Sequence, residues 1–425
     1  MVGGTAIEIS ASIETGVRSG ALAPGAGLPP VRTLAADLQV SPATVAAAYQ
    51  ALRGRGVIET LGRNGTRVRP RPPVVGERGQ WRLGVPAGAI DLSSGTPDPR
   101  LLPDLDAAVC APAHGDLATL ARDAFAGDGV APGVVGIAAG ALDAIERLLG
   151  AHLRPGDKVA VEDPGWANLL DLIAALGLVP VPVAMDEDGP SPSELSSVLG
   201  AGARAVVITT RAQNPTGAAV TAARAGVLRL VLARFPDVLV IEDDHAGPLS
   251  ALPLHSVCGI GTRWAFVRSV SKPYGPDLRC APFVADPVTA ARVDGRQRLG
   301  TGWVSTLLQR AVVTLWSSAE AAAQVRAAGR SYDRRRDGLV RALRERGLDA
   351  VGRTGINVWV RVPDETLAVS ALREAGWAVA PGALYRISSA PGFRVTISAL
   401  DESAIPVFAD AVVAAVGGRS GGRAW

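Results

Sequence analysis

The residues best suited to covalent chemistry in this chain are its lysines, because it has only two among 425 residues, Lys158 and Lys272. A guanidinium is no nucleophile, whereas the primary amine of a lysine can form a Schiff base with a carbonyl compound. Lys158 follows the turn Arg154-Pro155-Gly156-Asp157, where a solvent-exposed lysine is expected. Lys272, in Ser269-Val270-Ser271-Lys272, lies just beyond an apolar run. We therefore expect Lys272 to be the reactive amine.

Two motifs that precede Lys272 supply an acid and an amide. The acid is Asp243, with Asp244 as the alternative, at the end of the apolar run Val240-Ile241. A carboxylate at such a strand end can keep a pyridine nitrogen protonated. The amide is Asn214, in Asn214-Pro215-Thr216-Gly217. This motif alone is typical of an ordinary turn. Because it precedes the acid and the lysine, however, we interpret the side-chain amide of Asn214 as a hydrogen-bond donor to a phenolic oxygen on the same ring as the pyridine nitrogen.

Other residues can bind anions or stack on a ring. A glycine turn that begins a predicted helix offers free backbone N–H groups to a phosphate, and a serine and an arginine flank Lys272. The expected phosphate ligands are Gly140, Ala141, Leu142, Ser269 and Arg279. Trp166 follows a predicted strand end and can stack on a ring. Arg394, in Gly392-Phe393-Arg394-Val395, can bind a substrate carboxylate through both arms of its guanidinium.

Together these groups meet the requirements of one cofactor. An amine, a carboxylate, phosphate ligands, a phenolic-oxygen donor and a stacking ring are what pyridoxal 5′-phosphate (PLP) needs from a protein. The sequence therefore predicts PLP as the cofactor. Lys272 is expected to form the aldimine and, with Asp243, to be catalytic.

These residues must be positioned by an alternation of strands and helices. Apolar strand-like runs occupy residues 158–161, 205–209, 238–241 and 264–267, and helical patterns lie between them, for example at 142–149 and 219–234. This alternation favours a mainly parallel α/β sheet, which binds ligands at the carboxyl ends of its strands. After about residue 325, a helix, a strand at 355–361, a helix at 365–375 and two more strands predict a smaller α+β part.

The first seventy residues have a different pattern. Helices are expected at 5–20, 31–38 and 42–54, the last with Ser41 as N-cap and Pro42 at its first position. Short strands at 56–60 and 67–69 surround the turn Gly62-Arg63-Asn64-Gly65. We interpret this order as a winged helix-turn-helix, whose second helix enters the major groove of DNA.

The DNA contacts are expected on that second helix and on the hairpin. The candidates are Arg32, Thr33, Ser41, Pro42, Thr44, Arg63, Gly65 and Thr66. Residues 1–80 hold nine arginines and five acidic residues and so carry +4, while the whole chain carries +3. This excess favours a polyanionic partner for this part. The alternative is a small structural helical domain with an arginine-rich surface.

The predicted organisation is a DNA-binding domain at 1–70, a Pro-, Gly- and Arg-rich linker at 71–90, and a PLP domain at 91–425. The PLP domain is divided into a large part at about 116–320 and a small part at about 325–416. No run approaches the ~20 apolar residues of a membrane span, and the start lacks a signal peptide pattern. Three widely separated cysteines fit a reducing cytoplasm, so we expect a cytoplasmic protein.

The N-terminal motifs resemble a known family of bacterial regulators. The segments Leu28-Pro29-Pro30-Val31-Arg32-Thr33-Leu34-Ala35 and Val40-Ser41-Pro42-Ala43-Thr44-Val45 are similar to the winged helix of the GntR superfamily. The order of motifs over about 91–415 resembles fold-type I PLP enzymes of aminotransferase class I/II. The whole chain thus looks like the MocR-type subfamily, which implies a homodimer that binds double-stranded DNA and an amine or amino-acid effector.

The sequence departs from that family at several site positions. His245 and His114 stand where tyrosines are usual, and Ala141 replaces the usual serine of the phosphate turn. Asn168 stands where some members have an arginine for the effector carboxylate. His245 can still donate a hydrogen bond to the cofactor, and Asn168 and Arg394 remain the candidates for binding the substrate or effector.

Three functions fit these observations. The first is a transcription regulator that senses PLP, or an amino compound that reacts with it, through Lys272. The second is an active aminotransferase with a secondary DNA-binding domain, since Lys272, Asp243 and Arg394 are all present. The third is a binding module without PLP. The first two are compatible, because a lysine poised for exchange can perform half a transamination.

Overall fold

The computed structural model describes residues 2–18, 21–23, 25–54, 57–60, 65–68, 78, 82–111 and 115–417. The chain divides into two units, Met1–Val74 and Val75–Trp425, and each is described here by itself. Within the described ranges, no helix has the length and apolar character needed to cross a membrane.

The first unit consists of three helices and a small antiparallel sheet. The helices are α1 (Ala6–Arg18), α2 (Val31–Asp37) and α3 (Pro42–Gly54), and the strands are β1 (Gly27–Leu28), β2 (Ile58–Thr60) and β3 (Thr66–Val68), in the order β1-β3-β2. As predicted, Ser41 caps α3, because its Oγ accepts the backbone N–H of Thr44 at 3.1 Å. One face of α3 is buried against α1 and α2, including Val45 and Tyr49. The apolar spacing therefore predicted this core.

The second unit is built on an eight-stranded sheet with the order β5-β12-β11-β10-β9-β6-β7-β8. Its strands are β5 (Val134–Ala138), β6 (Lys158–Asp163), β7 (Val179–Asp186), β8 (Gly189–Pro190), β9 (Ala203–Thr209), β10 (Leu239–Asp243), β11 (Trp264–Val267) and β12 (Ala281–Ala285). Strands β7, β6, β9, β10 and β11 are parallel, whereas β12 is antiparallel to both of its neighbours. The carboxyl ends of β6, β9 and β10 therefore share one edge, where the site residues follow.

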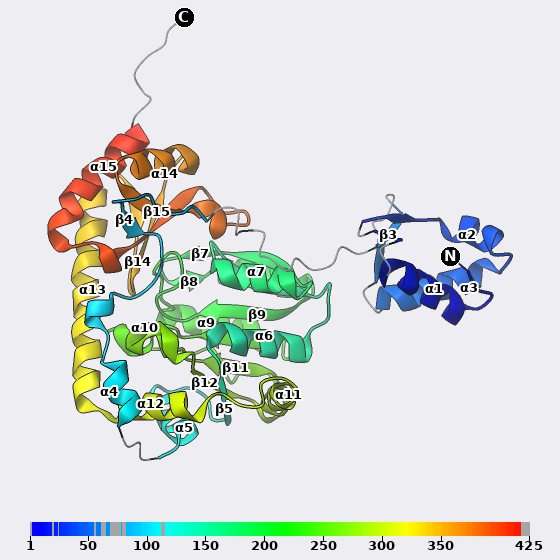
Figure 1. The fold of residues 1–425 in the computed structure, drawn as a ribbon, viewed down its shortest axis with the longest axis horizontal. Coiled ribbons are helices and arrows are strands. Elements are labelled where there is room, and N and C mark those ends of the chain that lie inside the picture. Colours follow the sequence, from blue (N-terminus) through cyan, green and yellow to red (C-terminus); the bar gives the residue numbers. More distant parts are fainter. Residues whose placement is uncertain are drawn as a thin grey trace, which may run out of the picture. The chain divides into compact units, whose positions relative to one another are not determined.

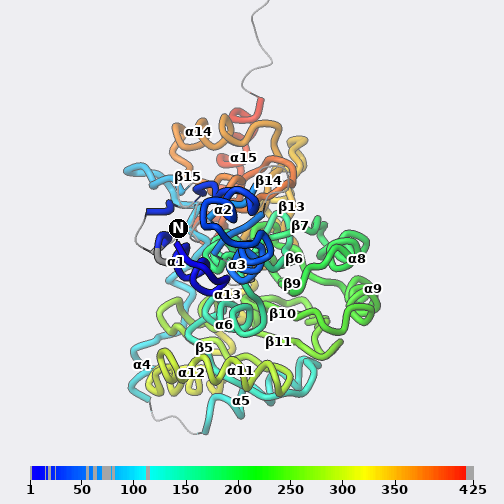
Figure 2. The backbone as a smooth tube through the Cα atoms, turned by 90° about the vertical axis from the view of Figure 1, so that its right-hand side faces the viewer, coloured from blue at the N-terminus to red at the C-terminus, as the bar shows by residue number. Residues whose placement is uncertain are grey.

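Alternating side chains bury both faces of this sheet. Val159 and Val161 pack with α6 (Ala141–His152), α7 (Ala167–Ala175) and α11 (Pro287–Arg298), while Ala160 between them packs on the opposite side. That opposite face is covered by α5 (Leu117–Gly127), α8 (Pro192–Gly200) and α9 (Ala222–Ala233). Figure 2 shows α8 and α9 side by side. Coverage on both faces explains why these strands read as continuous apolar runs.

A five-stranded sheet forms the smaller part of this unit, in the order β13-β14-β16-β15-β4. Its strands are β4 (Ile90–Leu92), β13 (Asp349–Val351), β14 (Asn357–Arg361), β15 (Trp377–Pro381) and β16 (Gly392–Thr396). The remaining helices are α4 (Leu105–Cys110), α10 (Ser271–Tyr274), α12 (Thr306–Ser317), α13 (Ala319–Glu345), α14 (Glu365–Glu374) and α15 (Ile405–Gly417). The long helix α13 runs along both parts in Figure 1.

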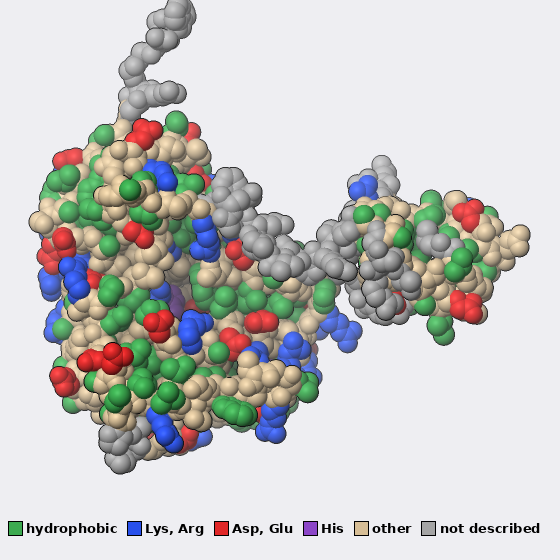
Figure 3. Space-filling model, viewed as in Figure 1, with side chains coloured by type: hydrophobic (Ala, Val, Ile, Leu, Met, Phe, Trp, Pro, Cys, Tyr) green, Lys and Arg blue, Asp and Glu red, His purple; other side chains and the backbone are tan. Residues whose placement is uncertain are grey.

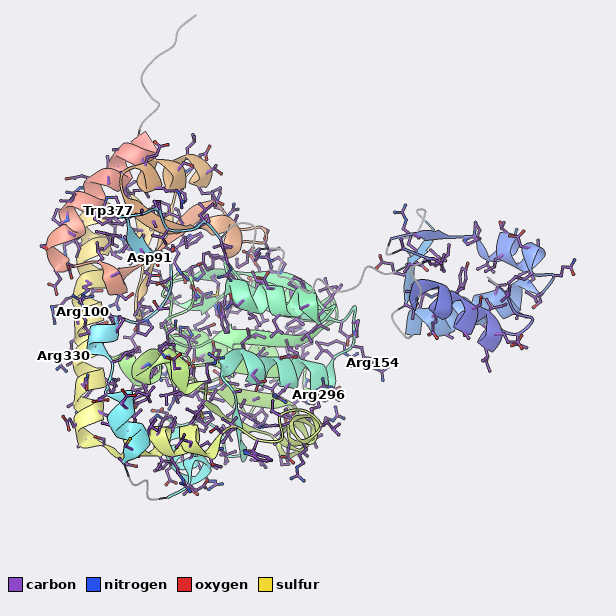
Figure 4. The ribbon with its side chains drawn as sticks, in the orientation of Figure 1. Asp91, Arg100, Arg154, Arg296, Arg330 and Trp377 are labelled. Atoms are coloured by element: carbon purple, nitrogen blue, oxygen red, sulfur yellow. The ribbon has the colours of Figure 1, made fainter. Side chains whose placement is uncertain are left out.

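The first strand of this small sheet comes from an unexpected part of the chain. Strand β4 pairs with β15 in parallel, with Ala378 opposite Asp91, and Asp91 and Trp377 are close together in Figure 4. The predicted linker 71–90 therefore ends inside a strand, at Ile90, and the small part is not confined to 325–416. Three residues are too few to show an alternating pattern, and the partner strand lies far away in the sequence, so local reasoning missed this pairing.

Candidate functional site

A cavity of about 440 Å³ lies at the carboxyl edge of the large sheet, a size typical of small-molecule sites. Most of the predicted cofactor and substrate residues line it: Ala141, Leu142, Trp166, Asn168, Asn214, Asp243, His245, Ser269, Lys272, Arg279 and Arg394. Gly140, the remaining candidate, is the N-cap residue of α6 directly before Ala141. These candidates are spread over about 250 positions of the sequence, from Ala141 to Arg394, and they converge on one cavity.

Lys272 lies at the second residue of α10, within this cavity. Its Nζ donates a hydrogen bond to the backbone oxygen of Gly95. Burial, and then the positive charge of Arg394, lower its pKa from 10.5 to about 8, while Asp243 acts in the opposite direction. The environment therefore raises the fraction of the neutral amine, which is the nucleophilic form. Lys158, by contrast, is exposed, as expected.

Asp243 is the last residue of β10 and is only 2% exposed. Its Oδ1 is buried and has no hydrogen-bond partner among the described residues. Its Oδ2 lies 3.4 Å from Nδ1 of His245. An unpartnered buried carboxylate oxygen is costly, so this atom is suited to a donor supplied by a ligand.

Asp244, the alternative acid, is fully engaged elsewhere. Its Oδ2 lies 2.7 Å from both Arg211 and Arg268. Burial raises the pKa of this carboxyl, but the two guanidinium groups outweigh burial and bring it to about 2. Because that value is below the ordinary 3.8, the stabilisation is complete above about pH 4 and is lost as the pH falls through 2. Asp244 therefore has a structural role, and Asp243 is the acid of the cavity.

Replacing Asp244 with asparagine is expected to lower the free energy of unfolding by about 3–5 kcal/mol, because it removes the charge that two buried guanidinium groups share, and of these only Arg268 has another carboxylate partner, Asp128. Scanning calorimetry of the full chain at pH 7 measures this effect on the second unit. The matched control is Asp294→Asn, since Asp294 is 59% exposed in its pair with Arg298, and its loss is expected to cost less than about 1 kcal/mol. Equal, small effects of both changes would contradict the structural role of Asp244.

The turn before α6 has a glycine at its N-cap and leaves the first backbone N–H groups of the helix without a side-chain cap. Gly140 has φ +113° and no side chain caps the helix. A Cβ at Gly140 would lie 2.6 Å from Nη2 of Arg279, and that Nη2 donates to the backbone oxygen of Ala139 at 3.1 Å. The guanidinium and the start of the helix are therefore side by side, a combination that binds anions.

Arg394 and Asn214 contact each other in the cavity. Nη1 of Arg394 donates to Oδ1 of Asn214 at 3.1 Å, and Nη2 donates to the backbone oxygen of Ser93 at 2.5 Å. Its Nε is buried without a partner among the described residues, and its guanidinium lies 5.0 Å from the ring centre of Tyr385. With Oδ1 of Asn214 occupied, the amide NH₂ of Asn214 is the group left to donate to a ligand.

Sequence reasoning missed the buried polar residues that support this loop. Gln213 Nε2 donates to Glu162 and to the backbone oxygen of Pro164, and Gln213 Oε1 accepts the hydroxyl of Thr216. Burial raises the pKa of Glu162 to about 7. Glu162 and Gln213 lie beside the motifs of Trp166 and Asn214, and that adjacency is the sequence signal that could have indicated them.

The described DNA-binding candidates lie on the surface of the first unit. Arg32, Thr33, Ser41, Pro42 and Gly65 are exposed, and Thr44 and Thr66 are half-buried. The hydroxyl groups of Ser41 and Thr44 are 2.9 Å apart at the start of α3. Arg63 and His114, which the sequence also singled out, lie outside the described residues.

Comparison with known proteins identifies related families for both units. Residues 95–412 match the family described as aminotransferase class I and II. Residues 5–68 match the bacterial regulatory proteins of the gntR family. The two matches follow each other in the order predicted from the motifs.

Several curated proteins are similar to the chain. The vitamin B6 salvage pathway transcriptional repressor PtsJ of Salmonella typhimurium is 40% identical over 96% of this chain and 97% of its own length. The pyridoxine biosynthesis transcriptional regulator PdxR of Corynebacterium glutamicum is 29% identical, with 67% of each chain covered. The transcriptional regulator TauR of Rhodobacter capsulatus is 27% identical, with 93% of each chain covered.

Solved structures of aminotransferases share the fold. The alpha-aminoadipate aminotransferase LysN of Thermus thermophilus, complexed with N-(5′-phosphopyridoxyl)-L-leucine, has a TM-score of 0.70 at 21% identity and covers 82% of this chain and 96% of its own. The kynurenine aminotransferase of Pyrococcus horikoshii has a TM-score of 0.69 at 20% identity, with 79% and 92% covered. At such identities the likeness concerns the fold alone.

Proposed function

Because the chain belongs to the MocR-type regulators, in which a gntR-family domain precedes a domain of the aminotransferase class I and II family, we propose that it regulates transcription through PLP. PLP binds at Lys272, and the DNA-binding residues are those at the start of α3 and on the hairpin. The repressor name of the Salmonella relative, which refers to vitamin B6 salvage, supports this assignment.

The observation that carries the cofactor proposal is the unpartnered Oδ1 of Asp243. A protonated pyridine nitrogen is the donor that this buried oxygen lacks, and the glycine turn at Gly140 beside Arg279 suits the phosphate. When bound, PLP supplies an aldehyde for amines and a ring that withdraws electrons. The residues present therefore fit the group.

Each protein group then has a defined task. Lys272 presents a largely desolvated amine with a lowered pKa, and Asp243 would hold the proton of the ring nitrogen through its unpartnered Oδ1. With PLP bound, Asn214 would donate from its amide to the phenolic oxygen, and Trp166 would cover the ring. Arg394 binds the carboxylate of an amino-acid effector by exchanging its present carbonyl partners for charged oxygens.

We propose a homodimer as the DNA-binding form. Helix-turn-helix regulators bind two half-sites about one turn of DNA apart, and a two-fold dimer matches the symmetry of such an operator. The signal is PLP itself or an amino compound that reacts with it.

The spectrum of the full chain with PLP and a panel of amino acids tests the proposal. A sensor is expected to show a cofactor band that shifts with an amino acid and stays shifted. An aminotransferase, the second candidate, would lose the band and regain it with a 2-oxo acid. The retained set of Lys272, Asp243 and Arg394 in one cavity is the observation that favours this second activity. Absence of any PLP band would contradict both candidates.

The double substitution Arg32→Ala and Thr44→Ala is expected to weaken binding to a selected DNA duplex by about ten- to a hundredfold, because it removes a phosphate contact and a base-facing hydroxyl. The duplex is first selected by the wild-type protein from a random pool, and affinity is measured by fluorescence anisotropy. Arg298→Ala, an exposed arginine of the second unit, is the control that should bind normally. Unchanged binding by the double variant would contradict the assigned DNA surface.

A further inference from the structure

An arginine from the segment before the small sheet reaches the cavity. Nη2 of Arg82 donates to Oδ1 of Asn168 at 2.5 Å, and Arg82 lines the cavity. The same segment is held by neighbouring contacts: Arg78 bonds to Asp171 and to the backbone oxygen of Arg386, and Arg373 donates to the backbone oxygen of Gly84. The bond to Asn168, on α7, places the exposed side chain of Arg82 at the cavity wall.

Among the residues that the structure describes, Arg82 has no carboxylate partner. Among the described residues, no acidic side chain lies within ion-pair distance of it, and its hydrogen bond goes to a neutral amide. Burial lowers the pKa of Arg394, and the charge of Arg82 lowers it further. Both guanidinium groups line the same cavity, so an anion between them would meet two positive charges.

The charge of the cavity lining is one-sided. Among the described lining residues, Arg82, Lys272, Arg279 and Arg394 are basic and Asp243 alone is acidic. The outer face of this unit in Figure 3 instead mixes acidic and basic side chains. PLP uses Asp243, Lys272 and Arg279 in the proposed site, and an amino-acid carboxylate uses Arg394. The positive charge of Arg82 then remains for a second anionic group.

We infer that the cavity binds an α-amino dicarboxylate, with one carboxylate on Arg394 and the distal carboxylate on Arg82. Arg82 exchanges its bond to the neutral Asn168 for a charge-assisted pair, which is stronger. Asn168 stands where some members of the family have an arginine, and Arg82 brings a guanidinium to that place from another segment. This inference rests on the proposed PLP site.

A consequence concerns the connection to DNA binding. Arg82 lies on the stretch of chain between the DNA-binding unit and strand β4. A ligand carboxylate bound to Arg82 would therefore contact the segment that leads from the DNA-binding unit to β4, and no residue of the sheet would lie between them.

Isosteric ligand pairs test the inference on the PLP-loaded full chain. Isothermal titration calorimetry compares L-glutamate with L-glutamine and L-aspartate with L-asparagine, which differ chiefly in the distal charge. In at least one pair the wild-type protein is expected to bind the dicarboxylate about tenfold or more tightly than its amide. Arg82→Gln is expected to remove this preference while leaving the affinity for the amide unchanged.

Arg298→Gln is the control, because Arg298 is an exposed arginine of the same unit that lies outside the cavity lining and holds no part of the segment of Arg82. It should keep the preference of the wild type. The inference is overturned if the wild type shows no preference for the dicarboxylate, or if Arg82→Gln keeps that preference. In either case, a PLP band that depends on Lys272 leaves the proposed function intact. A wild-type protein that binds no PLP overturns both.

Discussion

The Lys272→Ala protein is expected to lose the PLP absorption band completely, whereas the Lys158→Ala protein keeps it. The chain has no third lysine, and Lys158 is exposed, with its Nζ on the backbone oxygen of Ala201. Substituting Lys272 therefore removes the one lysine amine that faces the cavity. Visible spectra of the purified proteins, each titrated with PLP, measure this difference.

The rate at which the wild-type band forms should also depend on pH in a defined way. With a pKa of about 8 instead of 10.5, about a tenth of Lys272 is neutral at pH 7, against on the order of one in 3,000 for an ordinary lysine. The rate is expected to rise about tenfold per pH unit up to about pH 8 and then level off. A band that survives in Lys272→Ala, or a rate still rising above pH 9, would contradict the assigned amine and its environment.

The Asp243→Asn protein is expected to react with amino acids about a hundred- to a thousandfold more slowly than the wild type, because an amide cannot stabilise the proton on the ring nitrogen as a carboxylate does. The rate is measured by stopped-flow absorbance after an amino acid is mixed with the PLP-loaded protein. The effect should fall on this rate more than on PLP affinity, since Arg279 and the helix start still bind the phosphate.

Stability provides the control for this substitution. In the structure, Oδ1 of Asp243 has no partner among the described residues and Oδ2 lies at 3.4 Å from His245. The cofactor-free Asp243→Asn protein should therefore melt at nearly the wild-type temperature, unlike Asp244→Asn. A normal reaction rate with Asp243→Asn would show that the ring nitrogen has another partner.

The sequence alone was sufficient to predict the helices and strands that have long periodic patterns, and the motifs attached to them. Strand β11 occupies the predicted residues 264–267, and α3 occupies 42–54 with the expected cap at Ser41. Such elements are specified locally, because spacing determines which side chains face the core and a serine satisfies the first N–H groups of the helix. The rarity of lysine likewise narrowed the candidate amines to Lys158 and Lys272, and the motif around Lys272 indicated which of the two is reactive.

The tertiary structure decided what depends on contacts between distant residues. Adjacent Asp243 and Asp244 cannot be distinguished by spacing, but one faces the cavity while the other meets Arg211 and Arg268. Strand β4 has too few residues to show an alternating pattern, and it forms because its backbone pairs with β15. The bond between Arg82 and Asn168 joins residues 86 positions apart. Local sequence determines the periodic elements and their caps. Buried ion pairs and the pairing of edge strands follow only from the packing of the whole chain, because they are stabilised by residues that are distant in the sequence.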